Sequence, residues 1–211
     1  MIHEQSLRQP SKHFNGDPMR QTLFSLFTLL SVAISTPALA TWTLDNNASR
    51  LNFISVKKGT VAENHHFTQL SGTITEQAQV NISVDLTSVN TNIVIRDQRM
   101  QKHVFETDKY SAATFIAQLE PSLFKTLKVG EVQMLNVNGK IAFHGQQQDV
   151  SIAVSVVKLT ADKILVNTVK PFFMNADAYG VVAGINKLKA LASLPSINTV
   201  VPVSFSVTFH H

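Results

Sequence analysis

The sequence predicts an all-β fold, and three observations carry this prediction. Apolar and polar residues alternate with a period of two in eight or nine short segments, as in strands with one buried face. Turn-forming residues separate these segments, and helical spacing occurs in only two places. Many short strands without a long helix form a barrel or a sandwich. The pattern modestly favours a barrel, since about eight strands can close around packed side chains or one elongated ligand.

The first strands precede residue 80. A short strand begins at Trp42 and ends in a turn at residues 45–47, whose polar side chains favour turns. Residues 50–56 alternate and form the second strand. Residues 67–74 form the third strand, and Gly72 within it predicts a bulge or a sharp bend, as at a barrel corner.

The central stretch of the chain runs from a strand into a helix and back. Residues 80–86 alternate as a strand, and the polar run 88–92 ends it because short polar side chains compete with strand pairing. From residue 93 to 105 apolar residues recur at helical spacing, with charged residues between them. Alternation returns at residue 113. We expect this short amphipathic helix to cover the mouth of a barrel.

The next segments continue as strands. Residues 113–119 form one strand, and a loop follows at residues 121–126. The dipeptide Asn138–Gly139 divides residues 128–143 and predicts a hairpin, although one longer strand with a bulge is the alternative. A second turn is expected at residues 145–149.

Four further elements complete the chain. Residues 150–156 show the clearest alternation of all, and residues 163–170 form the following strand. A helix is expected over residues 186–193, where leucines lie on one side. Residues 200–209 alternate strictly and form the closing strand.

The first forty residues have the composition of a secretory signal peptide. Residues 23–34 are apolar and uncharged, Arg20 supplies the positive flank, and residues 38–40 form a small-x-small cleavage signal. A membrane anchor is disfavoured because a spanning helix needs about 20 apolar residues. We expect translation to begin at Met19 and cleavage to follow Ala40, which leaves residues 41–211 as one domain. With no cysteine in the chain, this domain depends on its core rather than on disulfides.

The basic residues are dispersed along the chain. The formal net charge is +4, but only Lys57 and Lys58 are adjacent. Scattered charge of this kind is typical of a solvated surface. We therefore expect no nucleic-acid partner, no basic membrane patch and no stable insertion into a membrane.

Patterns for catalysis or for metal binding are weak. The histidines His65, His66, His103 and His144 lack the spacing of a zinc site, and adjacent histidines in a strand face opposite sides. The chain has no cysteine and no Gly-x-Ser-x-Gly nucleophile motif. Carboxylates at Asp85, Glu106 and Asp108 are not brought together by any spacing. We expect neither a metal cofactor nor an enzyme.

Arg96 is the polar residue that most invites a functional interpretation. Its guanidinium could bind the oxygen atoms of a ligand head group. The structural alternative is an ion pair with Asp97 at the start of the helix, where an acidic side chain is favoured.

The central stretch resembles the YceI-like family of lipid- and polyisoprenoid-binding proteins. The similarity covers essentially residues 41–209, and its motifs are Asp85–Thr91, Arg96–Met100, Phe105, Lys109–Phe115, Phe67 with Ser71–Gly72, Gly139–Gly145 and Val201–Phe205. Ser111 stands where the family usually has proline, and Lys57 stands where it usually has histidine.

The resemblance implies a lipocalin-like, eight-stranded antiparallel barrel with short helices over the mouth. It implies a periplasmic protein that binds an isoprenoid, a quinone-like lipid or another amphiphile inside the barrel, for transport, storage or sequestration. No catalytic residue comes with the family pattern. The alternative is an envelope stress or interaction protein with a packed barrel and no lipid, and a homodimer stays open in both cases.

Alternation and the resemblance together predict which side chains line the interior. These residues are apolar, and a packed core would use the same types, since ligand pockets are lined mainly by aliphatic and aromatic side chains. Arg96 is the candidate for contact with the head group. The predicted lining residues are Phe53, Phe67, Val84, Met100, Phe105, Phe115, Phe143, Ile152, Val154, Phe172 and Phe205.

Overall fold

The structure is a computed structural model, and it describes residues 41–211. The predicted signal peptide, its start at Met19 and its cleavage after Ala40 lie outside the described residues and stay predictions. Within the described part of the chain, no helix is long and apolar enough to cross a membrane.

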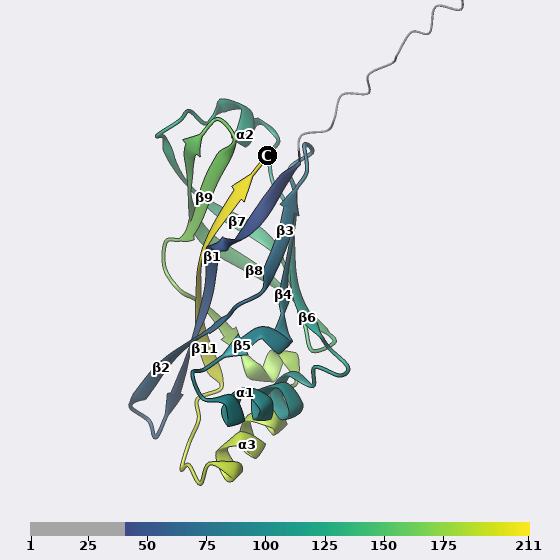
Figure 1. The fold of residues 1–211 in the computed structure, drawn as a ribbon, viewed down its shortest axis with the longest axis vertical. Coiled ribbons are helices and arrows are strands. Elements are labelled where there is room, and N and C mark those ends of the chain that lie inside the picture. The colour runs from purple at the N-terminus through teal and green to yellow at the C-terminus, as the bar shows by residue number, and fades with distance from the viewer. Residues whose placement is uncertain (1–40) are drawn as a thin grey trace, which may run out of the picture. The chain divides into compact units, whose positions relative to one another are not determined.

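Eight antiparallel strands pair in a ring and close a barrel (Figure 1). Closure is made by the first and last strands, which pair between Thr43 and Phe53 on one side and Val203 and His210 on the other. The predicted eight-stranded antiparallel barrel is therefore confirmed. In order around the ring, the strands are β1 (Trp42–Lys57), β3 (Leu70–Ile74), β4 (Gln79–Asp85), β6 (Ala112–Gln118), β7 (Val132–Phe143), β8 (Gln146–Thr160), β9 (Lys163–Thr168) and β11 (Val200–His210).

Three further strands lie outside the ring, which brings the total to eleven rather than the eight or nine predicted. β2 (Val61–Phe67) pairs with the second half of β1, and β5 (Val89–Asn90) pairs with β2. β10 (Phe172–Asn175) pairs with the first residues of β11. At the end of the barrel that contains the second half of β1 and the start of β11, the sheet does not close on itself. There it consists, in order, of β5, β2, β1, β11 and β10. We call this part of the sheet the half shell.

Two helical segments lie at the half-shell end (Figure 1). α1 (Val94–Met100) runs directly into a π-helical segment, η2 (Gln101–Phe105), which confirms the helix predicted over residues 93–105. α3 (Val182–Leu191) packs against η2 through Gly184. Met100, Val104 and Phe105 turn their side chains into the core, as the apolar spacing of the sequence requires.

Two predictions about helices needed correction. Residues 121–126, predicted as a loop, contain the short helix α2 (Ser122–Thr126), in which the Thr126 hydroxyl donates to the Ser122 carbonyl. The helix predicted over residues 186–193 begins earlier, at Val182. Single 3₁₀ turns complete the helical structure, and they are η1 (Leu86–Ser88) and η3 (Ala176–Tyr179).

The turn predicted at residues 45–47 is wrong, because β1 continues through this segment as a bulge. The register of β1 against β11 shifts between Asp45 and Arg50. The Asp45 carboxylate accepts hydrogen bonds from the backbone N–H groups of Asn47 and Ala48. Local side-chain bonding of this kind competes with the strand ladder, and here it produces a bulge rather than an end.

The single strand predicted over residues 67–74 is divided in two. Asn46, from the bulge of β1, accepts a hydrogen bond from the Leu70 N–H and donates one to the Thr68 carbonyl. These bonds hold the chain where it passes from β2 to β3. Gly72 does not form the predicted bulge, since β3 and β4 pair without a register shift. It permits a close approach instead, because a Cβ there would lie 2.6 Å from the Ile82 side chain.

The hairpin predicted at Asn138–Gly139 is also wrong, and the alternative of one longer strand with a bulge is correct only for the strand, since the pairing shows no register shift there. β7 passes through this dipeptide without a break, and a Cβ on Gly139 would lie 2.6 Å from the Phe115 ring. The true turn between β7 and β8 is at His144 and Gly145, whose φ values of 52° and 75° suit a two-residue hairpin. β8 therefore begins at Gln146, within the turn predicted at residues 145–149.

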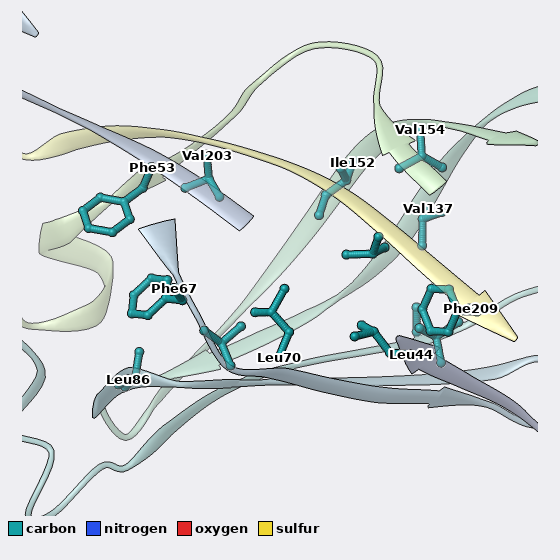
Figure 2. Packing of buried hydrophobic residues seen from close by; sticks show 14 of the residues in the cluster. Leu44, Phe53, Phe67, Leu70, Leu86, Val137, Ile152, Val154, Val203 and Phe209 are labelled. Atoms are coloured by element: carbon teal, nitrogen blue, oxygen red, sulfur yellow. The ribbon is translucent and has the colours of Figure 1, made fainter. Parts of the chain in front are cut away.

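The inward side chains of the ring and of the cover helices form one apolar core. Figure 2 shows this core from close by, with Phe53, Phe67 and Leu86 toward one end and Leu44 and Phe209 toward the other. The most deeply buried large side chains are Phe209, Leu86, Ile164 and Val154.

Candidate functional site

The core is not completely filled, and it encloses a cavity of about 570 Å³. Alternate residues of each strand face this cavity, because successive side chains point to opposite faces of a sheet. In β1 the facing residues are Leu51, Phe53, Ser55 and Lys57. Most of the wall is aliphatic or aromatic, which is the usual lining of a pocket for an apolar ligand.

All of the residues predicted to line the interior lie on the cavity wall. They come from eight strands and from α1 and η2, so alternation and helical spacing identified the correct faces. Their contact with a bound lipid stays a prediction. The residues are Phe53, Phe67, Val84, Met100, Phe105, Phe115, Phe143, Ile152, Val154, Phe172 and Phe205.

A continuous series of aromatic rings joins the strands to the cover. The ring centroids of Phe53 and Phe67 are 5.4 Å apart, those of Phe67 and Phe105 are 5.8 Å apart, and those of Phe105 and Phe143 are 6.0 Å apart. Phe143 continues the series to Tyr179, at 5.5 Å. These separations are typical of favourable tilted and edge-on ring pairs. The cover is therefore part of the cavity wall, because Phe105 belongs to η2.

The opening of the cavity lies at the start of α1. Among the described residues, only two large apolar side chains are both exposed and part of the cavity wall, namely Ile93 at 47% and Ile95 at 52% exposure. Leu194 and Ile197, in the loop after α3, line the cavity at the same end. A backbone hydrogen bond from Lys58 to Ser196 ties this loop to the β1–β2 hairpin.

The opposite end of the barrel is packed shut. Trp42, from the start of β1, is buried, and its ring centroid lies 6.4 Å from that of Phe124 in α2. Leu123 of α2 and Leu127, directly after this helix, are also buried. The segment predicted as a loop thus forms the floor of the cavity.

A polar cluster interrupts the apolar wall near the opening. Glu63 of β2 forms ion pairs with Lys57 at 2.7 Å and with Arg96 at 2.9 Å, and all three residues line the cavity. The hydrogen bond from Lys57 lowers the pKa of Glu63 below its ordinary value, and the bond from Arg96 adds to this effect. Glu63 is therefore ionised at neutral pH, and it links β1, β2 and α1 at the mouth.

Arg96 does not form the predicted ion pair with Asp97. Its guanidinium donates to the Thr91 carbonyl at 2.7 Å as well as to Glu63. Asp97 instead accepts a hydrogen bond from the Thr91 N–H at 2.9 Å. The two neighbouring side chains thus hold the same residue, Arg96 through the Thr91 carbonyl and Asp97 through the Thr91 N–H, and together they fix the segment before α1.

His65 lies inside the same cluster. Its Nε2 is 2.8 Å from the Ser55 hydroxyl oxygen, while its Nδ1 is buried without a hydrogen-bond partner in residues 41–211. The Nε of Arg96 is buried and unpartnered in the same part of the chain. Burial lowers the pKa of His65, and the positive charge of Arg96 lowers it further. His65 is therefore neutral at pH 7.

We expect acid to destabilise the fold through His65. The folded state holds the pKa of His65 below its ordinary value, so the unfolded state binds the proton first as pH falls. The free energy of unfolding should therefore decrease once the pH drops below about 6.5, until the lowered pKa is passed. Urea unfolding of wild type and His65→Gln at about pH 7.5 and about pH 5.5 measures this loss.

The control for this measurement is His66→Gln, since His66 follows His65 on β2 and is not part of the cavity wall. His66→Gln should lose as much stability on acidification as wild type, and His65→Gln should lose less. Equal losses in all three proteins would show that His65 does not carry the effect.

The described residues contain no group of three His, Asp or Glu side chains that could hold a metal ion. His103 and His144 lie on η2 and in the β7–β8 turn and do not converge with His65. The expected absence of a metal cofactor stays a prediction, since this finding concerns residues 41–211 alone.

The polar cluster has some features of a catalytic site but lacks others. Four side chains of this cluster, Lys57, Glu63, His65 and Arg96, are titratable and face the cavity. Ser55 and His65 form the hydrogen bond that a nucleophile and a base would form. No carboxylate in the described residues orients His65 from its Nδ1 side, which a serine–histidine–aspartate triad requires.

Sequence reasoning missed Glu63 and His65 as inward-facing residues because it did not recognise β2. The inward positions of β2 before Phe67 are Val61, Glu63 and His65, so hydrophobic alternation is absent there. The available signal was the fixed spacing of two from Phe67 back through His65 to Glu63. Once the strand is known to begin at Val61, these side chains fall on the same face as Phe67.

Comparisons with known proteins agree with this geometry. The model of the YceI-like domain family matches residues 42–209. A polyisoprenoid-binding domain from Saccharophagus degradans, implicated in plant cell wall breakdown, is 38% identical in sequence and has a TM-score of 0.79. Its alignment covers 82% of this chain and 98% of that domain. No match was found among curated proteins.

Two more distant structures show the fold alone. BcnA from Burkholderia cenocepacia is 17% identical, with a TM-score of 0.61, and the alignment covers 78% of this chain and 98% of BcnA. The YceI protein of Campylobacter jejuni is 14% identical, with a TM-score of 0.51, over 70% of this chain and 84% of that protein.

An eight-stranded antiparallel barrel closed around an apolar cavity is a lipocalin-like barrel. The match over residues 42–209 and the 38% identity to a solved member make the assignment more specific. The chain belongs to the YceI-like family. This family is generally one of binding proteins rather than of enzymes.

Proposed function

We propose that this protein binds an isoprenoid, a quinone-like lipid or a related amphiphile inside the barrel, without catalysing a reaction. The observation that carries the proposal is the cavity of about 570 Å³, whose wall is mostly apolar and carries a polar cluster near its opening. The 38% identical relative is described as a polyisoprenoid-binding domain, which supports the same class of ligand.

The cavity can hold such a lipid mainly through its tail. Removal of a methylene group from water contributes about 0.8 kcal/mol, so a long tail needs few polar contacts. The alternative, a packed barrel that interacts with other envelope components, is disfavoured by the unfilled volume. Transport, storage or sequestration in the periplasm follows from the expected signal peptide and from the family, and homodimer formation stays a prediction.

Arg96 and His65 are proposed to contact the head group. Both side chains line the cavity near its opening, and each has a buried polar atom, Arg96 Nε and His65 Nδ1, without a partner in the described chain. Buried polar groups are costly unless a hydrogen bond is formed, so an oxygen atom of a ligand would be favoured here. The two terminal nitrogens of the Arg96 guanidinium each already make one hydrogen bond, Nη1 to Glu63 and Nη2 to the Thr91 carbonyl.

Native mass spectrometry of protein purified without detergent tests the proposal. We expect an additional mass of several hundred daltons in about one-to-one ratio, which solvent extraction should release as a polyprenyl or quinone species. The Arg96→Met variant should retain less of a polar lipid while its barrel stays folded. A bare mass from folded wild type, with no uptake of added isoprenoid, would contradict lipid binding and favour the packed-barrel alternative.

A further inference from the structure

The opening of the cavity is surrounded by exposed apolar side chains. Ile93, Val94 and Ile95 are consecutive at the start of α1, and their exposed fractions are 47%, 72% and 52%. Leu191, at the end of α3, is also exposed. Consecutive exposed apolar residues are unusual on a monomer surface and typically mark a contact site. We call this set, together with Leu194 of the following loop, the mouth surface.

Basic side chains surround the mouth surface. Arg99 and Lys102 follow on α1 and η2, Lys187 and Lys189 lie on α3, and Lys58 lies at the tip of the β1–β2 hairpin. The chain segments that carry them are held together, because α1 packs against α3 and the hairpin is bonded to the loop after α3. Figure 1 shows the hairpin, α1 and α3 at the same end of the barrel.

The carboxylates nearest to the mouth surface do not cancel this positive charge. Glu63 is paired with both Lys57 and Arg96, and Asp97 is the one carboxylate on α1, η2 and α3, which together carry five basic side chains, Arg96, Arg99, Lys102, Lys187 and Lys189. The sequence predicted a uniformly solvated surface because these basic residues are far apart along the chain. Folding gathers them around an apolar centre, and that pattern is typical of proteins that bind anionic membrane surfaces.

We propose that the mouth surface docks on an anionic lipid bilayer, so that a lipid passes between the bilayer and the cavity without crossing water. This inference rests on the proposed function. Ile93 and Ile95 belong both to the mouth surface and to the cavity wall, so the apolar path is continuous from the docking face to the interior. Such docking is peripheral and is compatible with the absence of stable insertion.

Another exposed apolar patch provides a comparison within the same molecule. Val129, Val132 and Met134, at and before the start of β7, are exposed, and Met134 is 72% exposed like Val94. None of these three side chains lines the cavity. Docking through this patch would not bring a bilayer to the opening, so Met134 offers a matched control for Val94.

Flotation with lipid vesicles tests the docking. Wild type should bind vesicles of phosphatidylethanolamine with phosphatidylglycerol, and bind vesicles of phosphatidylcholine alone less well. Val94→Asp should reduce the partition onto anionic vesicles by about tenfold, since it replaces an inserted apolar side chain by a charge of the repelled sign. An acidic residue is favoured in the first turn of a helix, so this variant should fold.

Two further variants define the specificity of the effect. Met134→Asp introduces the same charge at an equally exposed position and should bind vesicles like wild type. The double variant Lys187→Glu/Lys189→Glu should bind anionic vesicles more weakly, by about fivefold or more for each residue. Vesicle binding by wild type should decrease as the salt concentration is raised. The rate of quinone transfer between vesicles should follow the same order.

The outcomes separate this inference from the proposed function. If wild type retains lipid in native mass spectrometry but does not bind anionic vesicles, or if Val94→Asp and Met134→Asp behave alike, the docking is overturned and lipid binding stands. If Val94→Asp slows transfer only when a protein partner is present, the mouth surface belongs to that partner and the docking is again overturned. If no form of the protein retains lipid, both proposals fail together.

Discussion

The Gly184→Ala substitution should destabilise the cover of the barrel, although the same change normally stabilises a helix. Alanine is favoured over glycine within a helix by about 1 kcal/mol. At Gly184 in α3, however, an added Cβ would lie 1.9 Å from the carbonyl oxygen of His103 and 2.8 Å from the Cα of Val104. Both atoms belong to backbone, so α3 must move away from η2. We expect a net loss of about 3 kcal/mol, at the upper end of overpacking effects.

This loss should be local to the mouth. Hydrogen exchange should show reduced protection in α3 and η2 and unchanged protection in β7 and β8, because the ring of strands does not depend on the contact. Release of bound lipid should become faster for the same reason. The control is Ala183→Gly, at the exposed neighbouring position, which should cost only about 1 kcal/mol through helix propensity. Increased stability in Gly184→Ala would show that the two helices are not in tight contact.

The Leu135→Trp substitution should remove most of the lipid from the purified protein. Leu135 is partly buried on β7, and its side chain faces the cavity. An indole ring at this position fills space that a lipid tail would occupy, and the wall has room for it because the cavity is about 570 Å³. We expect occupancy in native mass spectrometry to fall by about tenfold or more, while the thermal midpoint changes little.

Met134→Trp is the control for occlusion of the cavity. Met134 precedes Leu135 on β7 and points to the opposite face, where it is exposed. The same side chain is thus introduced one residue away, outside the barrel. If Met134→Trp retains as much lipid as wild type and Leu135→Trp retains less, the lipid lies inside the barrel. Equal occupancy in both variants would mean that the retained lipid lies elsewhere.

Much of the barrel could be predicted from the sequence because its strands obey simple alternation. In β8 and β11 one face is apolar and the other polar, so the order of the residues shows which side chains must be buried. Phe143, Ile152 and Phe205 were assigned to the correct face on this basis. The same reasoning placed Met100 and Phe105 inward, since helical spacing fixes one side of α1 and η2.

Predictions failed where a contact distant in sequence changed the local preference. Asn138–Gly139 favours a tight turn in isolation, but the Phe115 ring of the neighbouring strand packs over the glycine and keeps β7 extended. Asp45 and Asn46 favour a turn as well, but the continued pairing of β1 with β11 turns the same residues into a bulge. Neither contact can be recognised from the residues that surround the failed prediction.

The polar cluster shows a second reason why prediction from the sequence was incomplete. Glu63 and His65 occupy inward positions of β2 where apolar residues would be expected, and they are tolerated because Lys57, Arg96 and Ser55 reach them from β1 and α1. A pattern method that searches for apolar alternation overlooks such a strand. Local departure from the rule thus coincides with the candidate head-group site, as is common at functional positions.

Trp42 and Phe124 close the floor of the cavity, so a ligand enters and leaves at the opposite end, beside α1. For a lipid bound as proposed, the tail must enter first and the head group must remain near Arg96, at the opening beside Ile93 and Ile95. The cavity is then closed at one end, and the distance from its floor to its opening is fixed. Tails shorter than this depth leave empty space at the floor, and longer tails project past Ile93 and Ile95. Selection among chemically similar cargoes would thus be made by length, measured from the floor, rather than by recognition of each repeating unit.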